Sequence, residues 1–95
     1  MLWGWLPPFD DPIDPAFMDT LAVLYSDKND YAKAVEWQNK ALALAPQNPL
    51  FHLNYAKIHI KAGKKDLARK ELDALAKLGD KFAGHAEVAT LLKGL

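Results

Sequence analysis

The stretch from Tyr31 to Asn48 constrains the fold of this chain most strongly. It has the pattern of one amphipathic helix, because apolar residues such as Leu44 fall mostly on one side and charged residues mostly on the other. Pro46 ends the helix, since proline disfavours the helical conformation in the residue before it. Asn48 and Pro49 then start another helix, as the N-cap and the first helical residue. Two helices joined by so short a turn predict a helical hairpin.

Capping residues divide the rest of the chain in the same way. Asp14 precedes a proline and is expected to cap a first helix, while Asp30 and Asp80 are expected to cap the second and the fifth. Gly63 and Gly79 are expected to end the third and fourth helices in the left-handed conformation. The sequence therefore predicts an all-α domain with helices at about 15–26, 31–45, 49–62, 65–78 and 82–93.

The chain also contains an internal repeat. A shift of 34 residues superimposes equal residues, namely Pro15 on Pro49, Phe17 on Phe51, Ala22 on Ala56, and Ala34 on Ala68. A period of that length is typical of arrays of helical hairpins. The run DYAKAVEWQNKALALAPQNP strongly resembles the second helix and closing proline of a tetratricopeptide repeat. The family's usual tryptophan is replaced, by Met18 in the first repeat and by His52 in the second.

This resemblance implies a tetratricopeptide-like superhelix of stacked hairpins. The expected organisation is an arm at 1–14, followed by a domain at 15–95 that contains repeats 15–48 and 49–82 and a capping helix at about 82–93. The family binds a protein or peptide on a concave surface formed by the leading helices. Carried onto this chain, the expected partner-binding residues are Val23, Leu50, Leu53, Asn54, Lys57, Ile60, Lys61, Val88 and Leu91.

Two interpretations of that mostly apolar set remain open. The residues form an exposed groove that binds an extended or helical apolar segment of another protein, as contiguous apolar patches often do. Alternatively, the helical phase differs and they belong to the core. The function predicted first is that of a protein–protein interaction module. The second is a structural role, in which the domain forms a homo-oligomer or docks onto the rest of a larger protein.

The N-terminal arm is rich in aromatic residues and proline. Its expected anchors are Trp3, Trp5 and Phe9, which are too large and apolar to favour solvent. Two positions are open: the arm occupies the groove of its own chain or of a symmetry mate, or it packs elsewhere as an N-terminal cap on the first helix.

Composition excludes several classes of function. The 95 residues suffice for one small domain, and their formal net charge of zero gives no global argument for binding nucleic acid. No segment is apolar for long enough to insert into a membrane. The chain has no cysteine, which removes disulfides and thiolate chemistry. Cytoplasmic and periplasmic locations both remain compatible with this composition.

The sequence offers no catalytic constellation. Ser26 is its one serine, and its carboxylates are spread over turns and outer faces. His52 and His59 lie two helical turns apart, about 10 Å, which is too far to share one metal ion. No glycine-rich phosphate loop is present. We therefore predict a protein that is not an enzyme and has no cofactor or metal.

Overall fold

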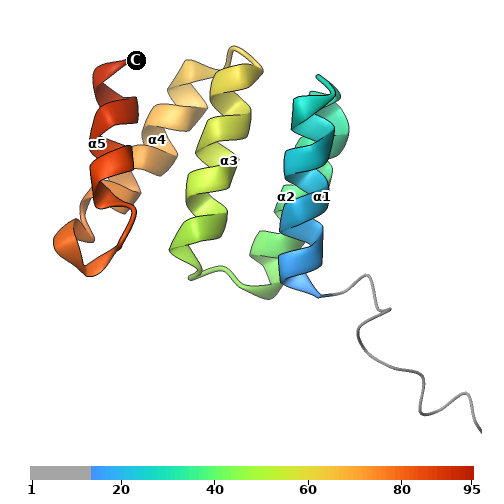
Figure 1. The fold of residues 1–95 in the computed structure, drawn as a ribbon, viewed down its shortest axis with the longest axis horizontal. Coiled ribbons are helices and arrows are strands. Elements are labelled where there is room, and N and C mark those ends of the chain that lie inside the picture. Colours follow the sequence, from blue (N-terminus) through green and yellow to red (C-terminus); the bar gives the residue numbers. More distant parts are fainter. Residues whose placement is uncertain (1–13) are drawn as a thin grey trace, which may run out of the picture.

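The computed structural model describes residues 14–95, which form five α-helices and one short 3₁₀ helix (Figure 1). The described residues contain no strand, so the predicted all-α class is confirmed. The arm, with Trp3, Trp5 and Phe9, lies outside the described residues apart from Asp14. The elements are α1 (Pro15–Asp27), α2 (Tyr31–Leu44), α3 (Pro49–Lys61), α4 (Lys65–Ala76), η3 (Gly79–Lys81) and α5 (His85–Lys93).

The two leading helices start in the same way. The carboxylate of Asp14 accepts a hydrogen bond from the amide of Ala16 at 2.9 Å, and the side-chain oxygen of Asn48 accepts one from the amide of Leu50 at 3.0 Å. Each cap satisfies an amide that has no partner within the first helical turn. A proline occupies the first helical position in both cases. The predicted N-caps of α1 and α3 are therefore confirmed.

The leading helices also end in the same way. Asn29 and Gly63, which are 34 residues apart, adopt left-handed conformations with φ of 67° and 80°. The amide after Asn29 donates to the carbonyl of Tyr25 at 2.9 Å, and the amide after Gly63 donates to the carbonyl of His59 at 2.8 Å. This six-to-one hydrogen bond is the Schellman motif. The 34-residue period in the sequence thus corresponds to repeated local geometry.

Buried alanines allow the helices of each hairpin to approach closely. Ala22 and Ala34 are fully buried in the first hairpin, as are their counterparts Ala56 and Ala68 in the second. A methyl side chain keeps the distance between two packed helices short. Helix α1 packs on α2 and α3 on α4, while the leading helices α1 and α3 also contact each other (Figure 1). The predicted arrangement of two adjacent hairpins is therefore present.

Phe51 and Ile58 of α3 form the seam between the hairpins. Phe51 packs with Met18 and Ala41, and Ile58 packs with two buried alanines of the first hairpin. A further core joins the second hairpin to α5. Its buried members are Leu53, Ala56, Leu72, Leu75, Phe82 and Val88.

The start of α5 differs from the prediction. The expected helix from Phe82 begins only at His85, and Asp80 lies in the 3₁₀ helix instead of capping α5. Phe82 is extended, with ψ of 123°, and its ring is buried. A Cβ atom on Gly84 would lie 2.7 Å from that ring, so the glycine leaves room for it. Burial of the Phe82 ring therefore outweighs continuation of the helix.

We expect Gly63→Ala to lower the free energy of unfolding by about 1 kcal/mol, because a Cβ atom disfavours the left-handed conformation. Chemical denaturation of the variant and the wild type measures this difference. Gly94→Ala is the matched control, since Gly94 has an ordinary φ of −83° and its added Cβ would lie 3.6 Å from the nearest atom. Equal losses in the two variants would contradict the role given to the left-handed turn.

Candidate functional site

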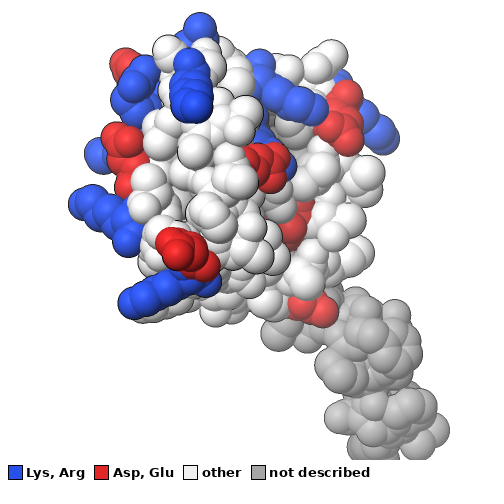
Figure 2. Space-filling model, turned by 60° about the vertical axis from the view of Figure 1, so that its left-hand side comes forward, with Lys and Arg blue, Asp and Glu red and all other residues white. Residues whose placement is uncertain are grey.

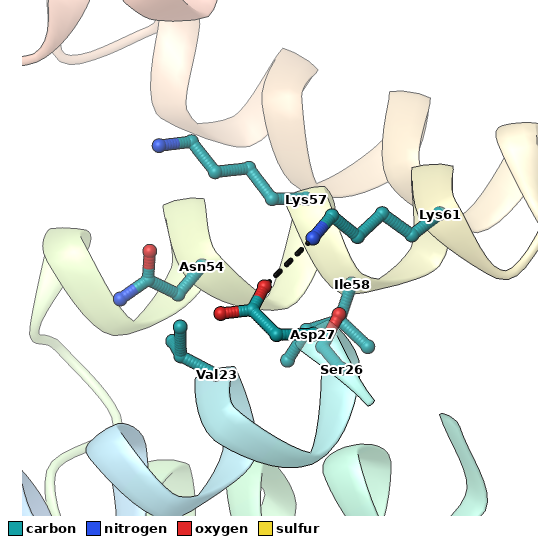
Figure 3. A pocket seen from close by; sticks show the side chains of 7 residues that line it. All are labelled: Val23, Ser26, Asp27, Asn54, Lys57, Ile58 and Lys61. Carbon is teal, nitrogen blue, oxygen red and sulfur yellow. Dashed lines mark hydrogen bonds and ion pairs between the residues drawn. The ribbon is translucent and has the colours of Figure 1, made fainter. Parts of the chain in front are cut away.

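A hollow of about 150 Å³ lies between the leading helices α1 and α3, on the surface where partner-binding residues were expected (Figure 3). Val23 retains 36% of its accessible surface there, and the buried Ile58 also lines it. This volume is below the 300–1,000 Å³ or so of a drug-sized ligand site. It has room for one or two side chains. The lining residues are Val23, Ser26, Asp27, Asn54, Lys57, Ile58 and Lys61.

An ion pair crosses one end of the hollow. The ammonium of Lys61 on α3 lies 2.9 Å from the carboxylate of Asp27 on α1 (Figure 3). Both side chains are at least half exposed. Exposed pairs of this kind contribute about 0–1 kcal/mol, so a partner can displace this one at low cost.

A second ion pair extends the surface toward the C-terminal helix. Lys57 on α3 pairs with Glu87 on α5. In Figure 3 the Lys57 side chain points away from the Asp27–Lys61 pair. Helices α1, α3 and α5 are thus linked successively by charged side chains.

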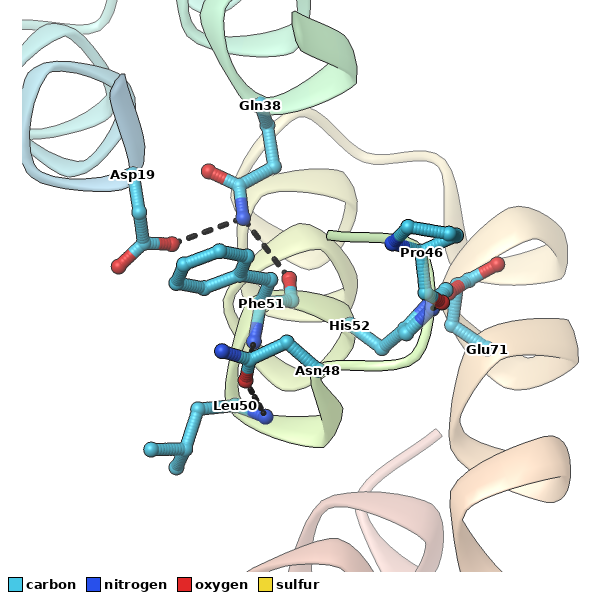
Figure 4. A network of polar contacts seen from close by, with 8 residues as sticks. All are labelled: Asp19, Gln38, Pro46, Asn48, Leu50, Phe51, His52 and Glu71. Carbon is cyan, nitrogen blue, oxygen red and sulfur yellow. Dashed lines mark hydrogen bonds and ion pairs between the residues drawn. The ribbon is translucent and has the colours of Figure 1, made fainter. Parts of the chain in front are cut away.

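A hydrogen-bonded network closes the other end of the hollow. The carboxylate of Asp19 on α1 accepts hydrogen bonds from the amide groups of Gln38 on α2, at 2.8 Å, and Asn54 on α3, at 3.0 Å. Gln38 also donates to the carbonyl of Phe51 at 2.8 Å (Figure 4). Gln38 is fully buried, and a buried amide needs such partners. We name this set, Asp19, Gln38, Asn54 and the Phe51 carbonyl, the three-helix network.

The structure brings four of the nine expected binding residues together. Val23, Asn54, Lys57 and Lys61 line the hollow. Leu50 is exposed but does not line it. Ile60 and Leu91 are partly buried against the core of the second hairpin.

Leu53 and Val88 were wrongly placed on the surface. They retain only 3% and 1% of their accessible surface and pack with Leu72 in the core between α3, α4 and α5. The error has a physical cause. Helix α3 is apolar on more than one side because it contacts α1, α2 and α4, so its periodicity does not define a single buried face.

Sequence reasoning also missed Gln38. A signal was present, because the 34-residue shift places Gln38 on Leu72, which is a buried leucine in the second repeat. A polar residue at a core position of the repeat indicates a hydrogen-bonded role.

His52 forms a separate polar contact between the hairpins. Its Nδ1 lies 2.6 Å from the carboxylate of Glu71 on α4, and its Nε2 lies 2.7 Å from the carbonyl of Pro46 (Figure 4). Burial lowers the pKa of His52, but the hydrogen bonds to Pro46 and Glu71, with the charge of Glu71, outweigh it and raise the pKa above its ordinary value. Because both nitrogens face acceptors, the protonated ring fits this position best.

The described residues hold no candidate metal site. Among residues 14–95 no group of three or more histidine or acidic side chains is placed to hold a metal ion. The hydroxyl-bearing Ser26 is buried. Within the same range, no helix combines the length and apolarity needed to cross a bilayer. Basic and acidic side chains alternate over the face shown in Figure 2.

The geometry defines a helical-repeat protein with a small hollow between successive leading helices. A family model described as tetratricopeptide repeat matches residues 27–95. The chain therefore belongs to the tetratricopeptide repeat family, and the resemblance seen in the sequence is confirmed. Members of this family are generally protein–protein interaction modules. No curated protein and no solved structure gives a significant match.

We expect Asp19→Ala to lower the free energy of unfolding by about 1–3 kcal/mol, because it removes a charged acceptor from the buried amide of Gln38. Urea denaturation measures the change. Asp73→Ala, at an exposed position on α4, is the control and should change stability by less than about 0.5 kcal/mol. Similar values for both variants would show that the three-helix network does not stabilise the fold.

We also expect a pH-dependent contribution from His52. Its pKa is higher in the folded chain, so protonation stabilises the fold. That contribution is fully present below the unfolded pKa of about 6.5 and is lost as pH rises through the folded pKa. The difference in Tm between the wild type and His52→Gln should therefore be largest below about pH 6.5 and shrink toward alkaline pH.

Thermal melts of the two proteins between acid and alkaline pH test this expectation. His59 is common to both, so its own titration cancels in the difference. In a Glu71→Gln background the effect of His52→Gln should lose most of its pH dependence. A difference in Tm that stays constant over the whole range would contradict the expectation.

Proposed function

We propose that this domain binds a peptide segment of another protein across its leading helices, with one apolar side chain of the segment inserted over Val23. The observation that supports this most directly is the hollow itself. It lies between two leading helices and combines an apolar centre with polar ends. What crosses it at one end is an exposed ion pair.

The chemistry of the lining restricts the partner. Asp19 already engages the amide of Asn54, and its carboxylate would repel a carboxylate placed there. The surface is therefore unsuited to recognising an acidic chain terminus through Asn54. Lys57 and Lys61 are each paired with an acid. The favoured ligand is a segment without strong net charge that carries a small or medium apolar anchor.

The size of the hollow limits affinity. One inserted apolar side chain contributes about 1.5–3 kcal/mol when it is fully buried. Tighter binding requires further contacts along the segment. The exposed Leu50, nearer the start of α3, offers one such apolar contact.

Selection of peptides from a displayed random library on the full chain tests the proposal. We expect the enriched peptides to share an apolar anchor flanked by polar residues. Val23→Glu should weaken their binding at least about tenfold, which corresponds to 1.4 kcal/mol, because it places a charge at the apolar centre. Fluorescence polarisation with a labelled selected peptide measures the loss.

Leu67→Glu is the matched control. Leu67 is an exposed leucine on α4 outside the hollow, so this variant should bind like the wild type. Absence of enrichment, or equal binding by the wild type and Val23→Glu, would overturn the proposal. Light scattering of the same proteins tests the alternative of self-assembly, which predicts a dimer that Val23→Glu dissociates.

A further inference from the structure

The outer face of α1 exposes apolar side chains at helical spacing. Phe17, Leu21 and Leu24 follow one another at intervals of four and three residues and so share one face. Phe17 retains 49% and Leu24 51% of its accessible surface. A hollow of about 140 Å³ opens on this face, lined by Leu21, Leu24, Tyr25 and Lys28. We name Phe17, Leu21 and Leu24 the α1 outer face.

The internal repeat indicates that such a face needs a cover. The residues 34 positions later, Phe51 and Ile58, correspond to Phe17 and Leu24, and they retain only 7% and 2% of their surface. The first hairpin covers both residues. Its covering side chains are buried alanines together with the larger Met18 and Trp37. The α1 outer face has the same apolar chemistry, but no hairpin precedes it among the described residues. In Figure 1 the first hairpin stands at the end of the row of helices.

We propose that the segment 1–13 of this chain covers the α1 outer face, with Trp3, Trp5 and Phe9 as the apolar groups that replace a preceding hairpin. This inference does not depend on the peptide-binding function. It distinguishes between the two positions that the sequence left open for the arm, because the Asp27–Lys61 ion pair already crosses the groove between α1 and α3, whereas the α1 outer face presents Phe17 and Leu24 half exposed.

The chemistry and the reach of the segment fit this face. Phe17 and Leu24 are about 10 Å apart along the helix axis, which about three residues of extended chain span. The segment supplies thirteen residues and joins α1 directly at Asp14. An apolar cavity of about 150 Å³ accepts one aromatic ring, and the hollow on this face is of similar volume.

A tethered cover is favoured over a separate molecule. A stable interface between two proteins buries about 800 Å² on each partner, and one face of a helix of thirteen residues offers little beyond its three apolar side chains. A segment of the same chain avoids most of the translational and rotational entropy that a second molecule loses on binding. The segment 1–13 is therefore the occupant that this small face suits best.

Tryptophan fluorescence of the full chain tests the proposal. Trp37→Phe leaves Trp3 and Trp5 as the only tryptophans. We expect their emission to be blue-shifted and protected from acrylamide. Phe17→Asp combined with Leu24→Asp should shift the emission to the red and raise the quenching constant several-fold, because the cover loses its apolar contacts. Leu67→Asp, at an equally exposed leucine on α4, should leave both readings unchanged.

A second measurement does not depend on how Trp37→Phe folds. Chains that keep Trp37 are labelled with 5-fluorotryptophan, with and without the double substitution Phe17→Asp and Leu24→Asp. The ¹⁹F chemical shifts of Trp3 and Trp5 should change between the two proteins, while that of Trp37 should not. Deletion of residues 1–12 should lower Tm by about 5 °C, as expected for a loss of about 1 kcal/mol in a domain of this size.

Three results would overturn the proposal. The first is emission typical of free tryptophan that the aspartates do not change. The second is a Tm unaffected by the deletion. The third is a dimer, detected by light scattering, whose dilution exposes Trp3 and Trp5, because that result assigns the α1 outer face to a second copy of the chain.

Discussion

Close contact between helices at alanine positions is the constraint on which the rest of this structure depends. Ala22 and Ala34 bring α1 against α2, and Ala56 and Ala68 do the same for α3 and α4. A larger side chain at any of these positions would push the two helices of a hairpin apart. The seam residue Ile58 packs onto the first pair of alanines. The spacing within one hairpin therefore also sets the surface on which the next hairpin rests, and with it the hollow between α1 and α3.

Local signals in the sequence predicted most of this architecture. The N-caps Asp14 and Asn48 and the left-handed Gly63 each depend on a few neighbouring residues, so they are readable without tertiary information. The 34-residue period is visible by comparing the sequence with itself. They gave the order and number of the helices and most boundaries to within one or two residues. The start of α5 was not readable in this way, because it depends on where the ring of Phe82 packs in three dimensions.

The candidate site was less predictable than the fold. Its location followed from the family resemblance, and Val23, Asn54, Lys57 and Lys61 do lie together. The family resemblance did not predict which of the expected residues are exposed at the site and which are buried. A helix that contacts three others is apolar on several sides, so the sequence alone did not separate exposed apolar residues from core residues such as Leu53. Pairing between distant polar groups, such as Asp19 with Gln38, also depends on contacts that no local pattern specifies.

The ion pair between Asp27 and Lys61 joins equivalent positions of the two repeats, because these residues are 34 apart. In a stack of such hairpins, this position of one unit therefore faces the same position of its neighbour. Two copies of the first unit side by side would place aspartate against aspartate, and two copies of the second would place lysine against lysine. Both arrangements are repulsive. The opposite charges therefore favour a stack of the two different units over a stack of two identical ones.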